Sequence, residues 1–511
     1  MFKALNLIFH RIVIIILLML IQILLIAGMV WRFNRYFVYF YAVCMVIGAV
    51  ILLYIINSSD NPEYKLAWII PLLLVPIFGG MLYLLFGFNR IKKKDREKNE
   101  IIRKKQAAAM EGMSAFSSIE SESLHAANQS RYILNSCTIV PFKDSFTEYL
   151  PLGETVFSRM KEELEKAERY IFMEYFIIEE GIMWDSILEI LVRKAAQGLD
   201  VRVIYDDVGS LFTLPYRYDK KLKKLGISCA IFNPFTPVLS SRFNNRDHRK
   251  ITVIDGHTAF TGGINLADEY INAVNKYGHW KDTGIIVKGK AAWGFTLMFL
   301  GIWEYVREEN RDYSYYYPPS FPAFPEESVS GYVHPYSDVP LDNAAVAENI
   351  YMNIIYKAEK YVYITSPYLI IDNGMVSALT AAAKSGVDVR IITPRHGDKW
   401  YVHSVTRSYY EVLLENGVRI YEYTPGFIHG KSFVADDAYG VVGSVNLDFR
   451  SFYLHFECGA WLYNTQSIGQ IRDDFFLTLE KCQEITLEEY RSIRYIRKFG
   501  RAVLRVFAPL M

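Results

Sequence analysis

A stretch of sequence that occurs twice constrains the fold of this chain more than any other feature. Lys166-Ala-Glu-Arg-Tyr170 returns 191 residues later as Lys357-Ala-Glu-Lys-Tyr361, and an apolar run follows in both places. Ala196-Gln-Gly-Leu-Asp-Val-Arg-Val203 returns as Lys384-Ser-Gly-Val-Asp-Val-Arg-Ile391. Each copy alternates β-type runs with helical patterns that end in glycine, which predicts two α/β lobes, each a mixed sheet flanked by helices, related by a pseudo-twofold axis. The predicted strands are 171–176, 201–205, 361–365 and 387–393.

The segments around the repeats give the expected domain boundaries. We expect the first lobe at 132–335 and the second at 336–486, with a proline-rich stretch at 315–340 as their connection. Residues 91–131 are first basic and then, from residue 106, rich in Ala, Ser, Gln and Glu, which predicts a juxtamembrane linker or a helical stalk. Residues 487–511 interleave six Lys and Arg with apolar side chains at helical spacing. This pattern predicts a basic amphipathic segment that lies either on an anionic surface or on the protein's own core.

The N-terminal region, residues 1–90, is strongly apolar. It contains uncharged stretches at 12–31 and 37–56 and a third apolar stretch at 66–88, which two prolines interrupt. About twenty helical residues cross a hydrocarbon core, so we expect three membrane-spanning helices, with a buried helical hairpin as the alternative. Residues 90–105 hold nine Lys and Arg against three Asp and Glu. The positive-inside rule therefore places the lobes on the cytoplasmic side of the cell membrane.

Composition excludes several other classes of protein. With 51% hydrophobic residues, the chain has ample apolar surface to form a core and is not a disordered protein. Its net charge of +1 argues against a nucleic-acid-binding protein. The five cysteines are scattered and never form a C-x-x-C pair, so neither a disulfide framework nor a cysteine zinc site is expected.

Each repeat contains one copy of a short pattern of potentially catalytic residues. A histidine is followed two residues later by a lysine and seven residues later by an aspartate, and an asparagine stands seventeen residues after the histidine. With ten histidines in the chain, a chance match to the first three positions is expected about 0.025 times. The first copy consists of His248, Lys250, Asp255 and Asn265, and the second of His429, Lys431, Asp436 and Asn446.

The spacing predicts where these side chains point. Residues i and i+2 of a strand share one face, so each histidine and its lysine enter the same cavity. Asp255-Gly256 and Asp436-Asp437 stand where a hairpin turn would reverse the strand, and the asparagine follows on the return strand. A pseudo-twofold axis then brings two imidazoles, two ammonium groups and two amides together.

Such a set of groups suits the cleavage of a phosphodiester. Two lysines can neutralise the non-bridging oxygens, where charge builds up during displacement at phosphorus. Two histidines that titrate near neutrality can act as nucleophile and general acid on opposite sides of the phosphorus. Because this chemistry needs no metal and lysine is a poor metal ligand, we expect neither a metal nor a cofactor.

The two copies resemble the HKD motifs of the phospholipase D superfamily, and within it the bacterial cardiolipin synthases are the most similar. The resemblance covers roughly residues 37–511, and its family usually has two N-terminal membrane spans, which match the second and third apolar stretches. It implies two phospholipase D-type lobes preceded by transmembrane helices. The residues that carry it are Asn245-Arg-Asp-His-Arg-Lys-Ile251, Phe260-Thr-Gly-Gly-Ile-Asn265, Arg407-Ser-Tyr-Tyr410, Phe427-Ile-His-Gly-Lys431 and Asn446-Leu-Asp-Phe-Arg-Ser451.

The resemblance also implies an activity. Enzymes of this family transfer a phosphatidyl group between two phosphatidylglycerol molecules, which gives cardiolipin and glycerol without a metal. One histidine would form a phosphohistidine while the other protonates the departing glycerol, and we assign these roles to His248 and His429 in that order. The phosphate oxygens would be held by Lys250, Lys431, Asn265 and Asn446.

Two acids complete the set that the resemblance implies. In related enzymes an acid downstream orients each histidine, and Glu457, twenty-eight residues after His429, fits the second copy. In the first copy position 276 is lysine, so Asp282 takes this role. Asp255 and Asp436 belong to the motif, but their turn positions leave both a structural and a catalytic role open.

Three other functions remain as alternatives. A phospholipase D-type hydrolase would use the same residues, with water in place of the glycerol hydroxyl. A different phosphatidyl headgroup transferase, such as a phosphatidylserine synthase, is equally compatible with the motif. A non-catalytic lipid-binding protein would predict the decay of at least one copy, yet both are intact.

Overall fold

The computed structural model describes residues 37–87, 93–235, 244–325, 328–342 and 344–510, together with eight residues between 20 and 32. These described residues form two compact units. One unit consists of the described residues within Met1–Ile91, Pro234–Asn245 and Val506–Met511, and the other of those within Lys92–Asn233 and Arg246–Arg505. The second unit holds both copies of the repeat.

The N-terminal unit is helical. The Asn61 side chain accepts a hydrogen bond from the Glu63 amide at the start of a helix whose first residue is a proline, an arrangement that favours a sharp helix start. A small core joins the helices through Ile51, Trp68 and Leu72. Its elements are α3 (Phe37–Asn57), α4 (Pro62–Leu74), α5 (Pro76–Leu82), the π turn η2 (Tyr83–Gly87) and the 3₁₀ turn η7 (Ala508–Leu510).

The expected membrane helices stay a prediction. The stretch 12–31 lies largely outside the described residues, as does residue 88. Among the helices that the structure describes, none is both long enough and apolar enough to cross a membrane. The described part of the stretch 66–88 is divided among α4, α5 and η2, and α4 ends before Pro76, which has no amide hydrogen to continue this helix.

The first lobe is a seven-stranded mixed sheet in the order β1-β8-β6-β5-β2-β3-β4. Strands β2, β3 and β4 are parallel and the other neighbours are antiparallel. The strands are β1 (Ser145–Leu150), β2 (Tyr170–Tyr175), β3 (Asp200–Asp206), β4 (Ser228–Phe232), β5 (Lys250–Ile254), β6 (Thr258–Gly262) and β8 (Gly284–Gly289). Its helices are α9 (Gly153–Glu165), α10 (Ile182–Ala196), α11 (Tyr218–Lys224) and α12 (Ala292–Arg307).

Helices cover both faces of this sheet. Phe172 of β2 stacks on Phe299 of α12 with ring centroids 4.7 Å apart. Its neighbours Ile171 and Met173 point to the opposite face, as the alternation of a strand requires, and join the core beneath α9 and α10. This arrangement, together with the second lobe, confirms the predicted α/β class.

The second lobe is an eight-stranded mixed sheet in the order β19-β13-β12-β10-β15-β16-β18-β9. Strands β10, β12 and β13 are parallel. The strands are β9 (Tyr332–Asp338), β10 (Tyr361–Thr365), β12 (Asp388–Pro394), β13 (Arg419–Tyr423), β15 (Ser432–Ala435), β16 (Tyr439–Gly443), β18 (Glu457–Tyr463) and β19 (Cys482–Ile485). The helices are α13 (Val346–Lys357), α14 (Asn373–Lys384), α15 (Trp400–Ser408), α16 (Tyr410–Leu414), α17 (Phe449–Tyr453) and α18 (Ser467–Leu479).

The four strands predicted from the repeats are present as β2, β3, β10 and β12. The expected hairpins also form, since β5 pairs with β6 around Asp255-Gly256 and β15 pairs with β16 around Asp436-Asp437. The boundary expected between residues 335 and 336 falls inside β9, which pairs with β18 at the edge of the second sheet.

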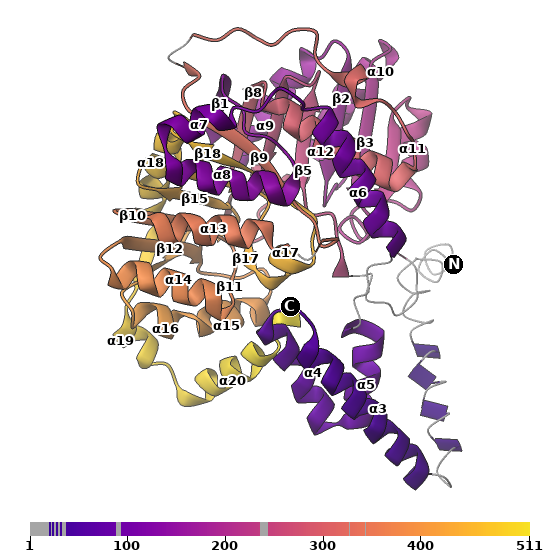
Figure 1. Ribbon diagram of the computed structural model, residues 1–511, viewed down its shortest axis with the longest axis vertical. Coiled ribbons are helices and arrows are strands. Elements are labelled where there is room, and N and C mark those ends of the chain that lie inside the picture. Colours follow the sequence, from indigo (N-terminus) through magenta and orange to yellow (C-terminus); the bar gives the residue numbers. More distant parts are fainter. Residues whose placement is uncertain are drawn as a thin grey trace. The chain divides into compact units, whose positions relative to one another are not determined.

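The segment expected as a linker or a helical stalk, 91–131, is helical and packed where the structure describes it. It forms α6 (Lys93–Ala108), α7 (Phe116–Glu122) and the start of α8 (Leu124–Cys137), which lies beside α13 (Figure 1). Gln106 of α6 donates a hydrogen bond to the Leu297 carbonyl of α12.

The C-terminal segment is a short helix, α19 (Leu487–Arg491), followed by α20 (Tyr495–Val506). The guanidinium of Arg505 lies 4.1 Å from the ring centroid of Tyr409 on the second lobe. Tyr495, Ile496 and Phe499 of α20 are exposed on the part of the chain that the structure describes, and they form an apolar face of this basic helix.

Two short backbone contacts connect the lobes next to the motif histidines. Strand β7 (His279–Lys281), from the first copy, pairs in parallel with β14 (Gly426–Ile428), from the second. Asp247 and Phe456 form a parallel bridge that is the equivalent contact with the roles of the two lobes exchanged. Each contact lies directly beside a motif histidine.

Candidate active site

The histidine and lysine of each copy stand at the beginning of a central strand. His248 comes two residues before Lys250, the first residue of β5, and His429 and Lys431 come directly before β15. All four side chains are buried. The charges of Lys250 and of Lys431, one from each copy, both lower the pKa of His248, so the two copies meet in one site, as the spacing predicted.

Each histidine is paired with the acid of the other lobe. Nδ1 of His248 lies 2.9 Å from Oε1 of Glu457, and Nδ1 of His429 lies 2.6 Å from Oδ2 of Asp282. Each acid was expected to orient the histidine of its own copy, but the structure places it beside the histidine of the other copy.

The contacts between the lobes explain this crossed arrangement. The His248 amide donates to the Phe456 carbonyl at 2.9 Å, and the His429 amide donates to the Lys281 carbonyl at 2.7 Å. These carbonyls belong to the residues immediately before Glu457 and Asp282. A backbone hydrogen bond thus brings each histidine alongside the opposite acid.

Both carboxylates are themselves held in place. The Ser444 hydroxyl donates to Oε2 of Glu457, and the Thr283 amide donates to Oδ1 of Asp282. Both acids are fully buried. Because a carboxylate accepts the Nδ1 hydrogen of each imidazole, Nε2 carries the lone pair and is the nucleophilic nitrogen.

Burial and the nearby cations keep both imidazoles neutral. Desolvation, and then the charge of Lys431, lowers the pKa of His429 to about 4 against the opposing effect of Asp282. The pKa of His248 also lies well below its usual value, because of burial and then the charges of Lys250 and Lys431. A phosphodiester anion in the site would raise the pKa of both rings by the same Coulomb interaction.

The two lysines lie beside the histidines as cations of reduced basicity. Each Nζ donates a hydrogen bond to the carbonyl of the histidine two residues earlier. Burial lowers the pKa of Lys250 to about 8 and that of Lys431 to about 7. A bound anion would restore their charge, so both suit contact with phosphate oxygens.

The two motif asparagines differ in their surroundings. Asn265 is engaged with the protein, since its Oδ1 accepts from the Ile177 amide at 3.1 Å and its Nδ2 donates to the Tyr270 hydroxyl at 2.7 Å. Tyr270 in turn packs edge-on against the His429 ring. The amide oxygen of Asn446 is buried and has no hydrogen-bond partner among the described residues. Of the two side chains, only Asn446 has an unsatisfied polar atom for a substrate.

The motif aspartates bind backbone rather than each other or the histidines. Asp255 accepts hydrogen bonds from the amides of residues 168, 169 and 170 at 2.8 Å each. Asp436 accepts from the amides of residues 359, 360 and 361 at 2.7–2.9 Å. Each aspartate thus anchors the start of the parallel strand next to its own hairpin, β2 or β10, at the turn end of the hairpin and away from its histidine. These contacts are those of a structural role, and a catalytic role remains open to test.

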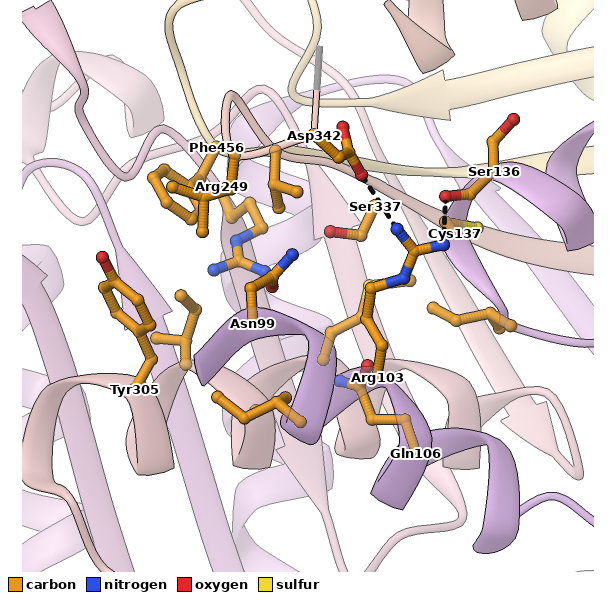
Figure 2. A pocket seen from close by; sticks show the side chains of 17 residues that line it. Asn99, Arg103, Gln106, Ser136, Cys137, Arg249, Tyr305, Ser337, Asp342 and Phe456 are labelled. Carbon is orange, nitrogen blue, oxygen red and sulfur yellow. Dashed lines mark hydrogen bonds and ion pairs between the residues drawn. The ribbon is translucent and has the colours of Figure 1, made fainter. Parts of the chain in front are cut away.

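The middle residue of the first motif points away from the site. The Arg249 Nε lies 2.8 Å from Glu174 and 3.1 Å from Asp247. Its side chain lines a pocket between α6, α12 and β9, where Arg103 contacts Asp342 and the Ser136 carbonyl (Figure 2). No motif histidine or lysine lines this pocket, so it lies behind the strand that carries the chemistry.

The sequence did not identify His455 or the aromatic residues around the site. His455 is buried, and its ring centroid lies 5.4 Å from that of His248. Phe176 packs edge-on against His248, and Trp280 packs against His429. The available signal for His455 was its position two residues before Glu457, in the turn that leads into β18.

Comparison with known proteins gives a consistent family match. A family model described as "Cardiolipin synthase, PLD-like domain" matches residues 160–291 and 351–477, and a phospholipase D-nuclease N-terminal model matches residues 45–87. The chain is 42% identical over 470 residues to an uncharacterized protein of Streptococcus mutans, which covers 91% of this chain and 100% of that protein. It is 34% identical over 471 residues to a cardiolipin synthase of Halalkalibacterium halodurans, which covers 91% of this chain and 92% of that enzyme.

A solved structure shares the fold. The phosphatidylserine synthase of Haemophilus influenzae matches with a TM-score of 0.57 at 15% identity, over 75% of this chain and 97% of that one. At this identity the match supports the two-lobed phospholipase D-like fold and not a substrate.

Proposed function

The chain belongs to the family of cardiolipin synthases with phospholipase D-like domains, and we propose that it transfers a phosphatidyl group from one phosphatidylglycerol molecule to another. The products are cardiolipin and glycerol. The observation that carries this proposal is the symmetrical set of two buried imidazoles, each with Nδ1 on a carboxylate and with a lysine beside it.

In the first half of the reaction, Nε2 of His248 attacks phosphorus and the bond to the glycerol oxygen breaks. His429, which takes up a proton on Nε2 once the bound phosphodiester anion has raised its pKa, gives this proton to that oxygen, and neutral glycerol leaves. The product is a phosphohistidine that carries the phosphatidyl group. Glu457 stabilises the positive charge that develops on the His248 ring, in the manner of the acid in a hydrolytic triad.

In the second half, the now neutral His429 removes the proton from a hydroxyl of a second phosphatidylglycerol. The resulting oxygen nucleophile attacks phosphorus, the bond to His248 breaks, and cardiolipin forms with no net change in protons. Lys250 and Lys431 neutralise the non-bridging oxygens in both halves. The assignment of nucleophile and acid to these two histidines rests on the family resemblance.

We assign the N-terminal unit to the lipid bilayer and the lobes to its cytoplasmic side. The unit exposes many large apolar side chains, including Val46, Leu53 and Leu74. The nine basic residues between 90 and 105 favour the cytoplasmic face, and the exposed apolar face of α20 is suited to an anionic lipid surface.

The test is a product analysis with purified protein in detergent. Phosphatidylglycerol, radiolabelled in both glycerol and acyl groups, is supplied with EDTA, and the lipid and water-soluble products are separated. Cardiolipin and free glycerol in equal amounts support the proposal. Phosphatidic acid without cardiolipin would show that water captures the intermediate and that the protein is a hydrolase.

The two histidines serve as the controls for that assay. His248→Ala and His429→Ala should each abolish turnover, whereas His257→Ala, at the β5–β6 turn, should retain it. His257 is a half-buried histidine whose ring nitrogen contacts Thr258 rather than either acid. Normal activity in either of the first two variants would refute the proposed mechanism.

A further inference from the structure

His455 is a buried histidine with no assigned task. Neither of its ring nitrogens has a hydrogen-bond partner among the described residues, although both are shielded from solvent. Its Nδ1 lies 3.8 Å from Oε1 of Glu457, which is too long for a hydrogen bond. A buried polar atom without a partner is costly, which points to a ligand that is absent from the isolated protein.

Two further side chains that can bind a metal ion, His248 and Glu457, lie next to His455. His248, His455 and Glu457 each offer one ligand atom, and these three atoms lie within 4.8 Å of one another. Ligands bound at about 2.1 Å to one tetrahedral ion are about 3.4 Å apart, so modest rotations of the rings would bring the three atoms to binding distance. Two imidazoles and one carboxylate, with a water molecule as fourth ligand, form a common set for zinc.

We propose that His248, His455 and Glu457 form a binding site for Zn²⁺ that competes with catalysis. An ion held by all three residues takes a nitrogen of His248 and also the carboxylate that orients this ring, so His248 can no longer act as the nucleophile. The inhibition rests on the proposed function, but the binding does not. Zinc here is an inhibitor rather than a cofactor. The proposal therefore agrees with the expectation that catalysis itself needs no metal.

The neighbouring charges set the character of this site. Lys250 and Lys431 repel a dication, and the ion must replace the hydrogen bond between His248 and Glu457. The anionic Glu457 and the nearby Asp282 offset part of this repulsion. We therefore expect a reversible site, weaker than a structural zinc site and emptied by EDTA.

Metal binding is tested first without lipid. Full-length protein in detergent is titrated with Co²⁺, whose visible absorption is intense in tetrahedral sites, and bound Zn²⁺ is measured by equilibrium dialysis. We expect one ion per chain in the wild type and in His257→Gln, and a loss of at least tenfold in affinity in His455→Gln. A thermal melt of each variant confirms that it is folded. Equal binding by His455→Gln and the wild type would overturn the proposal.

Inhibition is tested in the phosphatidylglycerol assay. Zn²⁺ should inhibit the wild type and His257→Gln at the same concentration, and EDTA should restore their activity. For His455→Gln, at least tenfold more zinc should be needed to halve its own uninhibited rate. Equal sensitivity of all three proteins would overturn the proposal, since zinc would then act elsewhere. If the wild type binds no Co²⁺, the metal site is refuted. If His455→Gln then raises the KM for phosphatidylglycerol and changes nothing else, His455 contacts the lipid instead. If the wild type is inactive but binds Co²⁺, and His455→Gln weakens this binding, the proposed function is refuted and the proposed metal site is supported.

Discussion

Nδ1 of His248 lies 2.9 Å from the carboxylate of Glu457, a residue 209 positions later in the chain and in the other copy of the repeat. His429 and Asp282 form the reciprocal pair at 2.6 Å. Each catalytic histidine of the proposed mechanism is therefore completed by the opposite lobe. Neither copy contains a full His–carboxylate pair, which explains why the two lobes must act as one site.

The crossed pairing predicts which histidine responds to the loss of each acid. In Glu457→Gln the Nδ1–H signal of His248 should shift while that of His429 stays in place, and Asp282→Asn should give the reverse, as measured by NMR on protein with ¹⁵N-labelled histidine. Each variant should lose about 10²–10⁴-fold in kcat, because the neutral amide no longer stabilises the charged ring. A response of His429 to Glu457→Gln would contradict the crossed arrangement.

The motif aspartates should matter for stability more than for chemistry. Asp255→Ala removes the acceptor of three backbone hydrogen bonds at the start of β2, and we expect the free energy of unfolding to fall by about 2–4 kcal/mol. The kcat of the protein that remains folded should stay within a few fold of the wild type. Denaturant unfolding and activity per folded molecule measure the two effects, and Asp436→Ala provides the matched variant in the second lobe. A loss of kcat at unchanged stability would restore the catalytic role.

The lysines give the reaction a predicted dependence on pH. Their pKa values of about 7 for Lys431 and about 8 for Lys250 are lowered, so both ammonium groups lose their protons as the pH rises through this range. Since the proposed role requires the charged form, kcat/KM should decline from about pH 7 and more steeply above about pH 8. In Lys431→Arg the guanidinium stays protonated, and the decline should begin about one pH unit higher. A flat profile up to pH 10 in the wild type would show that neither charge is needed.

Gly263 should tolerate no side chain, because it lies against one of the acids. A Cβ at this position would stand 2.1 Å from Oδ1 of Asp282, which orients His429. Gly263→Ala should therefore lower kcat by about 10–100-fold through displacement of this carboxylate. Gly469→Ala, on α18, is the matched control, since no atom lies within 4 Å of its added methyl group. Unchanged activity in Gly263→Ala would show that the position of Asp282 is not critical.

The repeat was sufficient to predict much of the fold. Strands β2, β3, β10 and β12 and both hairpins follow from local patterns of apolar residues, glycine and aspartate, and the motif residues were identified by spacing alone. The crossed pairing was not predictable, because it depends on β7 meeting β14, two short strands about 150 residues apart in the chain with no distinctive local pattern. His455 was missed for a similar reason, since a single histidine acquires meaning only when the fold places it beside His248.

The most direct test of the account is the identification of the covalent intermediate. His429→Ala is mixed with phosphatidylglycerol labelled in the acyl chain and quenched in base, and the labelled peptide is sequenced by mass spectrometry. Without its acid/base, this variant should still form a small amount of phosphatidyl-histidine and then fail to release it, and the label should lie on His248. Label on a residue other than His248 would contradict the mechanism. So would cardiolipin formation by His429→Ala at the wild-type rate, with no labelled histidine in this variant or in the wild type.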